Sequence, residues 1–159
     1  MAGILTEKAT EVFYMHQIMS FVFAALAGAA MALQGTLNTA AGKVIGTAEN
    51  TLVVHGIGAL TIGILLLCGI GKGDFSRFFE IPWYGYFGGV LSAVIIFAVI
   101  ASMDQLGVGN ATAVIILFQI TAALIIDCFG LFGAEKIPFA WSRIFGVLLL
   151  LIGTKLVLR

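Results

Sequence analysis

Apolar residues along the chain gather in long runs separated by short polar or glycine-rich stretches. Five runs are close to the roughly 20 residues that an α-helix needs to cross a bilayer. They cover residues 18–41, 51–70, 83–103, 110–130 and 139–158. Residues 1–17 carry apolar residues at helical spacing and are predicted to form an interfacial segment, and Asn110 is the expected N-cap of the fourth run. The pattern predicts an all-α integral membrane protein with one five-helix transmembrane domain, 18–158.

The composition supports this class and excludes several others. Hydrophobic residues make up 61% of the 159 residues and charged residues only 10%, whereas about a quarter of an ordinary soluble chain is charged. The net charge is zero, so no basic surface for nucleic acid is expected. The sequence contains no nucleophile–base set, metal-ligand cluster or phosphate-binding loop. We therefore expect no enzyme activity, no cofactor and no metal.

The charges and aromatic residues bear on how the chain lies in the lipid bilayer. Five spans put the two termini on opposite sides, and the basic residues divide five to three in favour of the N-terminal side: Lys8, Lys72, Arg77, Lys136 and Arg143 against Lys43, Lys155 and Arg159. This is a weak positive-inside signal. All Trp and Tyr residues sit at one side, although interfacial aromatics usually anchor both faces. These observations predict insertion in both orientations and an antiparallel, dual-topology homodimer.

Small residues recur at helical intervals within the spans. They allow helix backbones to approach closely, either inside one chain or between two chains. The candidates for such packing are Gly28, Gly35, Gly85, Gly89, Gly146 and Gly153.

Four polar side chains inside the spans are candidates for a solute-binding site. Gln34 and Asn38 are four residues apart and therefore share one face of the first helix. If the first, second and fourth spans surround a common cavity, His55 and Gln119 would line it as well. The alternative is that these side chains only form hydrogen bonds with one another across helices.

Asp127 is the one acidic residue inside the predicted spans, and it lies about one turn from the end of the fourth. A carboxylate close to a helix C-terminus is disfavoured by the helix dipole, so it requires a cation. Lys136 and Arg143 are both on the same side and either could form a structural ion pair with it. Intramembrane acids also serve as proton or ion relays. Asp127 and His55 are therefore the two candidates for proton or ion coupling.

The chain resembles the YdcZ-like bacterial inner-membrane proteins of the drug/metabolite transporter superfamily, relatives of the small multidrug resistance proteins. The resemblance rests on GAAMALQGTLNTAAGKVIG, QLGVGNATAVIILFQITAALIIDCFGLFG and RIFGVLLLLIGTKLV. Phe118 and Cys128 depart from the Gly and His common at these places in the family, so no role of such a histidine carries over. The resemblance implies a five-span half of a ten-helix, inverted-repeat transporter, with its site at the interface of two antiparallel copies.

Taken together, these features predict a secondary transporter that moves a small polar or metabolite-like solute across the bacterial inner membrane by alternating access. Two other classes stay open. One is a dual-topology ion channel, which would show much faster flux. The other is a non-transporting accessory subunit, which would bind no solute.

Overall fold

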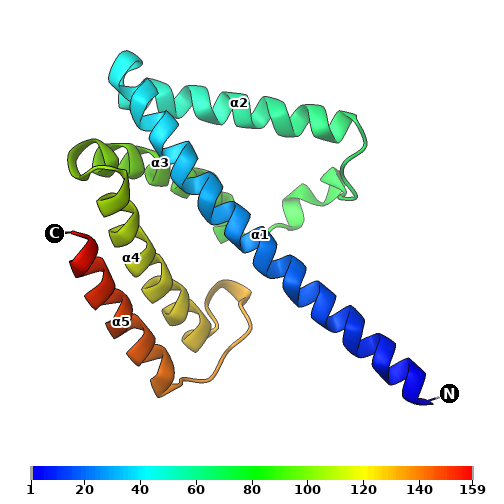
Figure 1. The fold of residues 1–159 in the computed structure, drawn as a ribbon. Helices are drawn as coiled ribbons and strands as arrows, with labels where there is room; N and C mark the ends of the chain where they lie inside the picture. Colours follow the sequence, from blue (N-terminus) through cyan, green and yellow to red (C-terminus); the bar gives the residue numbers. More distant parts are fainter. Residues whose placement is uncertain (1, 159) are drawn as a thin grey trace. The chain divides into compact units, whose positions relative to one another are not determined.

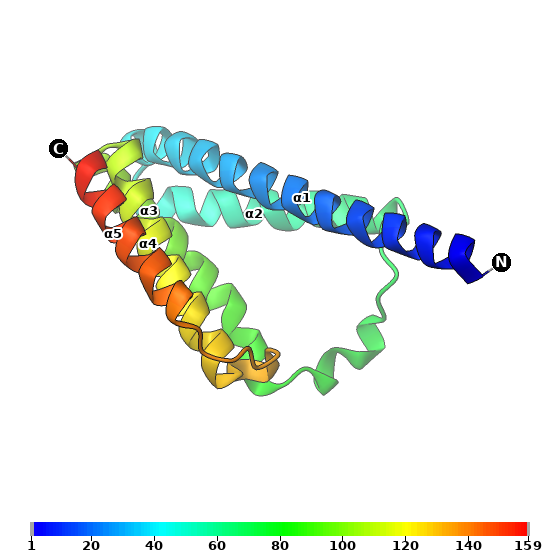
Figure 2. The ribbon, with the colours of Figure 1, turned by 60° about the horizontal axis from the view of Figure 1, so that its bottom comes forward.

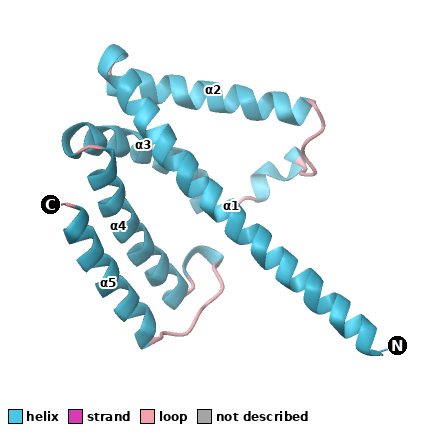
Figure 3. Ribbon diagram, viewed as in Figure 1, coloured by secondary structure: helices cyan, strands magenta, loops and turns pink. Residues whose placement is uncertain are grey.

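The computed structural model describes the backbone of residues 2–158 and the side chains of residues 14–158. Five α-helices follow one another along the chain (Figures 1 and 3): α1 (Ala2–Ile45), α2 (Thr47–Leu67), α3 (Phe87–Leu106), α4 (Val108–Phe129) and α5 (Trp141–Val157). Three short 3-10 helices lie between them: η1 (Phe75–Glu80), η2 (Trp83–Tyr86) and η3 (Leu131–Gly133). No strand occurs within residues 2–158. The prediction of an all-α protein is confirmed.

Four of these helices are long and apolar enough to cross a membrane. Within the described residues they are Tyr14–Ile45, Thr47–Leu67, Trp83–Leu106 and Val108–Phe129. The last helix, α5, has 17 residues, which is at the lower limit of about 17 for a membrane-crossing helix.

The chain divides into two compact units, Met1–Gln34 and Gly35–Arg159. The first unit consists of the N-terminal part of α1. This helix passes residues 17 and 18 without a break, so no change of backbone conformation marks the end of the segment expected at the interface. The interfacial position of residues 1–17 stays a prediction.

In the second unit, single glycines connect two pairs of helices. Gly46 separates α1 from α2 with φ +99°, and Gly107 separates α3 from α4 with φ +80°. Glycine adopts positive φ at little cost, which permits these abrupt reversals. The amide of Ala111 donates to the carbonyl of Gly107 at 3.1 Å, so the backbone bonding resumes at once. The N-cap of α4 is therefore Gly107 rather than Asn110.

We call the helix ends joined by Gly46 and Gly107 the turn end of the second unit. The opposite ends, joined by residues 68–86 and 130–140, form the loop end. Figures 1 and 2 show that α2 and α5 run in different directions away from the turn end. The two ends thus differ in how closely their helices can pack.

Burial follows the same division. The buried residues of the second unit with a side chain all lie toward the turn end: Asn38, Thr39, Asn50, Thr51, Ile100, Met103, Ala111 and Thr154. Many large apolar side chains elsewhere are exposed, and at most 11% of the residues in each span's most apolar window are buried. Such an apolar exterior suits a helix bundle surrounded by lipid or by another chain.

Candidate functional site

Asn38 lies in a small polar cluster at the turn end. The Nδ2 of Asn50 donates to the backbone oxygen of Asn38 at 3.1 Å, linking the first turn of α2 to α1. Only 8% of Asn38 and 3% of Asn50 are exposed. Sequence reasoning missed Asn50 because it placed the second helix from residue 51, whereas α2 begins at Thr47. The sequence signal that could have identified Asn50 is an amide side chain directly before the predicted second span.

His55 lies about two turns into α2 and makes two side-chain contacts. Its Nδ1 is 2.8 Å from the backbone oxygen of Thr51, and its Nε2 is 3.0 Å from the Oγ of Ser92 on α3. A carbonyl oxygen only accepts, so Nδ1 carries the hydrogen in this contact. In the neutral ring, Nε2 is then an acceptor for the Ser92 hydroxyl. Ser92 was not among the predicted site residues.

The other two candidates for solute binding are exposed. Gln119 lies in the middle of α4, and its side chain makes no hydrogen bond with the part of the chain described here. Gln34 is also exposed and ends the first unit. The second unit therefore connects Asn38 with Asn50 and His55 with Ser92, but it makes no hydrogen bond from Gln119 to either pair.

Asp127 lies near a cation in the first turn of the next α-helix, α5. Its Oδ2 is 3.8 Å from Nη1 of Arg143, with 36% and 31% of the two side chains exposed. This separation is too long for a hydrogen bond, so the attraction is electrostatic. No ion pair joins Asp127 to Lys136, both of which are described. Of the two cations considered, Arg143 is the one that the fold places beside the carboxylate.

A second pair of charges lies at the turn end. Lys43 on α1 and Asp104 on α3 are 2.8 Å apart between Nζ and Oδ1, with 63% and 39% of their side chains exposed. A pair this exposed contributes about 0–1 kcal/mol.

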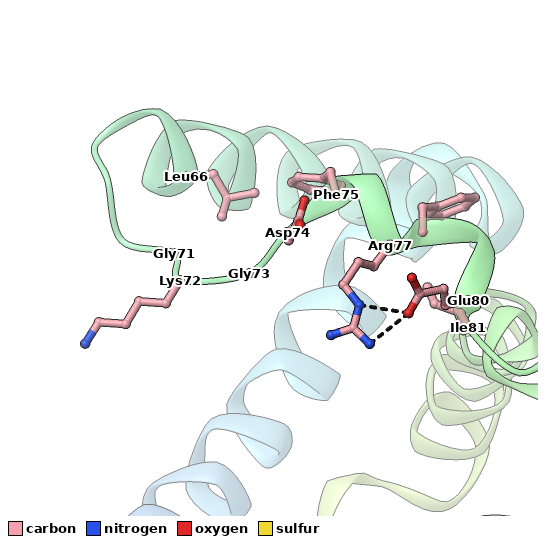
Figure 4. A pocket seen from close by; sticks show the side chains of 10 residues that line it. Leu66, Gly71, Lys72, Gly73, Asp74, Phe75, Arg77, Glu80 and Ile81 are labelled. Atoms are coloured by element: carbon pink, nitrogen blue, oxygen red, sulfur yellow. Dashed lines mark hydrogen bonds and ion pairs between the residues drawn. The ribbon is translucent and has the colours of Figure 1, made fainter.

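Residues of the loop between α2 and α3, together with Leu66 of α2, line an open pocket of about 840 Å³ (Figure 4). Arg77 and Glu80 are paired beside it at 2.7 Å, and the Lys72 side chain points away from them. The side chain of Asp74 caps η1 by accepting from the amide of Ser76 at 2.9 Å. Hydrogen bonds from the Ser76 side chain and backbone lower the pKa of Asp74. None of the predicted site residues lines this pocket.

The predicted packing glycines fall into two groups. A Cβ at Gly35 would lie 2.7 Å from Sδ of Met103 and 3.0 Å from Cγ1 of Val99, so α1 and α3 approach closely there. A Cβ at Gly85 would be 2.8 Å from Cγ2 of Ile81 in the adjacent loop. Open space surrounds the corresponding position, within the described chain, at Gly28, Gly89, Gly146 and Gly153.

Comparison with known proteins gives one match. A sequence model for the family described as "Putative inner membrane exporter, YdcZ" matches residues 19–156. The matched region reaches from α1 almost to the end of α5. No curated protein and no solved structure matches the chain.

Proposed function

We propose that this chain, which belongs to the family described as "Putative inner membrane exporter, YdcZ", is a secondary transporter of a small polar or metabolite-like solute. Family membership and the apolar helices make it a multi-pass membrane transporter of the inner membrane. That role requires binding and conformational change rather than covalent catalysis. The proposal adds the solute class and alternating access as its mechanism.

The observation that carries the proposal is the position of Gln119. It is exposed in the middle of α4, which is long and apolar enough to cross a membrane. Moving an unpaired amide from water into pure hydrocarbon costs roughly 4–8 kcal/mol. Gln119 should therefore face another protein surface or a polar solute rather than lipid tails.

A second copy of the chain in antiparallel orientation would supply such a surface. Gly146 and Gly153 on α5 have open space beside them within the described residues, and small residues favour close helix contacts. The weak charge bias and the one-sided aromatic belt support two orientations. With α5 as the fifth span, two copies would form a ten-helix inverted repeat with a shared midplane site.

Within this site, we assign solute binding to Gln34, Asn38 and Gln119, with His55 as a further candidate. His55 and Asp127 are the candidates for coupling to protons. His55 bonds to a hydroxyl, and Asp127 lies beside Arg143 without a hydrogen bond between the two side chains. Both arrangements leave a titratable group near polar partners inside a span.

The site assignment can be tested by efflux from proteoliposomes preloaded with labelled neutral amino acids, sugars or nucleosides. Gln34→Leu and Gln119→Leu should each reduce saturable efflux at least tenfold, because the solute loses hydrogen-bonding groups. Gln105→Leu is the matched control, since Gln105 is an exposed amide close to the α3–α4 turn. Efflux that survives both substitutions would refute the site. Flux far above about 10³ s⁻¹ would indicate a channel instead.

The dimer can be tested separately by topology. A cysteine added after Arg159, in a chain lacking Cys68 and Cys128, is labelled in intact cells with a membrane-impermeant reagent. Labelling of about half the molecules, becoming complete after permeabilisation, is the result expected for two orientations. Labelling near zero or near completion in intact cells would exclude the dual-topology homodimer.

A further inference from the structure

The contact between His55 and Ser92 connects two helices and involves a group that can change charge. The imidazole belongs to α2 and the hydroxyl to α3, with 3.0 Å between Nε2 and Oγ. On its other side the ring is held by the backbone oxygen of Thr51 at 2.8 Å. Both ring nitrogens thus have partners, and the ring orientation is fixed.

The same two contacts fit both protonation states of the imidazole. In the neutral ring, Nδ1–H donates to Thr51 and Nε2 accepts from the Ser92 hydroxyl. When the ring gains a proton at Nε2, the direction of the second bond reverses and Nε2–H donates to the Ser92 oxygen. The hydroxyl hydrogen can then rotate to a backbone carbonyl three or four residues earlier on α3, as serine commonly does in helices.

No fixed charge competes for this proton among the described residues near the pair. His55 forms no ion pair there. The charged residues of α2, α3 and the adjoining end of α1 are Glu49, Asp104 and Lys43. Asp104 is paired with Lys43 at 2.8 Å and lies about 18 Å along α3 from Ser92. Glu49 is about 9 Å along α2 from His55.

We propose that Ser92 is the positioning residue for His55, and that the two side chains form a proton-responsive link between α2 and α3. The link keeps its hydrogen bond in both protonation states, but the bond is stronger when the imidazole is charged, because hydrogen bonds to ionised groups are stronger than neutral ones. Proton binding would then tighten the contact between these helices. The inference rests on the proposed function for its role in transport, since His55 is one of the two coupling candidates.

The test uses the full chain, reconstituted in lipid nanodiscs with ¹⁵N-labelled histidine. The sequence has two histidines, so His16→Gln leaves His55 as the one imidazole signal. In the neutral ring the Nδ1–H tautomer should dominate, because the backbone oxygen of Thr51 can only accept. Ser92→Ala should move the ¹⁵N resonance of the unprotonated Nε2 to the position of an imidazole nitrogen that accepts no hydrogen bond, because the substitution removes the hydroxyl that donates to it.

Ser102→Ala is the matched control because Ser102 lies on the same helix and its Oγ bonds only locally, to the Val99 oxygen at 3.0 Å. It should leave the Nε2 resonance unchanged, and Ser92→Thr should restore that resonance by retaining the hydroxyl. Equal Nε2 resonances for Ser92→Ala and Ser102→Ala would overturn the inference, as would a dominant Nε2–H tautomer in the unsubstituted pair. If Ser92→Ala does not fold, the tautomer of His55 in the unsubstituted pair still tests the inference.

Transport measurements separate this inference from the proposed function. If the Nε2 resonance of His55 shifts as expected in Ser92→Ala but His55→Gln leaves proton-driven flux unchanged, the link stands and the coupling role of His55 fails. If flux depends on His55 but the Nε2 resonance is insensitive to Ser92, the coupling role stands and the positioning role of Ser92 fails.

Discussion

The two ends of the second unit use different means to hold their helices. At the turn end, single glycines bring α1 to α2 and α3 to α4, and buried side chains fill the space between the helices. At the loop end, residues 68–86 and 130–140 make long connections with mostly exposed side chains. Contacts there are between neighbours in sequence, such as Arg77 with Glu80, or between residues that are partly exposed, such as Asp127 and Arg143.

This difference shows how a very apolar chain specifies its helix contacts. Apolar burial distinguishes poorly between helix contacts in lipid, because lipid tails are as apolar as the side chains. Close backbone approach and interhelical hydrogen bonds then decide which helices meet. Gly35 against Met103 and Asn50 against Asn38 supply both at the turn end. Substitutions at that end should therefore cost more stability than substitutions at the loop end.

The largest effect is expected from Gly35→Leu. A side chain at this position would enter the space of Met103 and Val99, and such overpacking costs about 1–3 kcal/mol. Unfolding in mixed micelles of increasing SDS content would measure the loss. Gly58→Leu is the control, since a Cβ there has nothing described within 4 Å. Equal stability of the two variants would contradict the close approach of α1 and α3.

A smaller loss is expected from Asn50→Leu. The substitution removes the amide that donates to the oxygen of Asn38, and an interhelical hydrogen bond in a membrane protein is worth about 0.6–2 kcal/mol. The same unfolding assay measures the change. Thr61→Val provides the comparison, because exposed Thr61 bonds only to the Ile57 oxygen of its own helix. A loss no greater than that of the control would mean that the amide adds nothing to the turn end.

The Asp127–Arg143 pair should have a still smaller effect on stability. A double-mutant cycle with Asp127→Asn and Arg143→Gln should give a coupling energy below about 1 kcal/mol, because both side chains are about one-third exposed. The same variants separate the two roles of Asp127. Loss of proton-driven flux with unchanged stability would indicate coupling. Loss of stability with retained flux would indicate a structural pair.

The smallest change is expected from Arg77→Ala at the loop end. Its ion pair with Glu80 spans three residues and is mostly exposed, so we expect a loss below about 0.5 kcal/mol that disappears at high salt. Unfolding at low and high ionic strength measures it. A loss as large as that from Asn50→Leu would show that the loop end contributes to helix packing, and the distinction between the two ends would fail.

Sequence reasoning could locate the helices because the relevant signal is local. Runs of apolar residues identify where a chain can cross hydrocarbon, whatever the rest of the fold does. The apolar runs overlap the helical segments, although α2 begins four residues and α4 two residues before the predicted spans. Those beginnings depend on positive φ at Gly46 and Gly107, which a hydropathy pattern does not contain.

The candidate site was predictable only as a set of residue types. The sequence by itself determined the membrane class, the family resemblance and the presence of polar side chains at Asn38, His55 and Gln119. The tertiary structure decided which partners these residues meet: the Asn50 side chain for the backbone oxygen of Asn38, Ser92 for the His55 side chain, and no described hydrogen-bond partner for the Gln119 side chain. It also placed Arg143, rather than Lys136, beside Asp127. These pairings depend on the rotation and register of one helix against another, and local sequence spacing fixes neither.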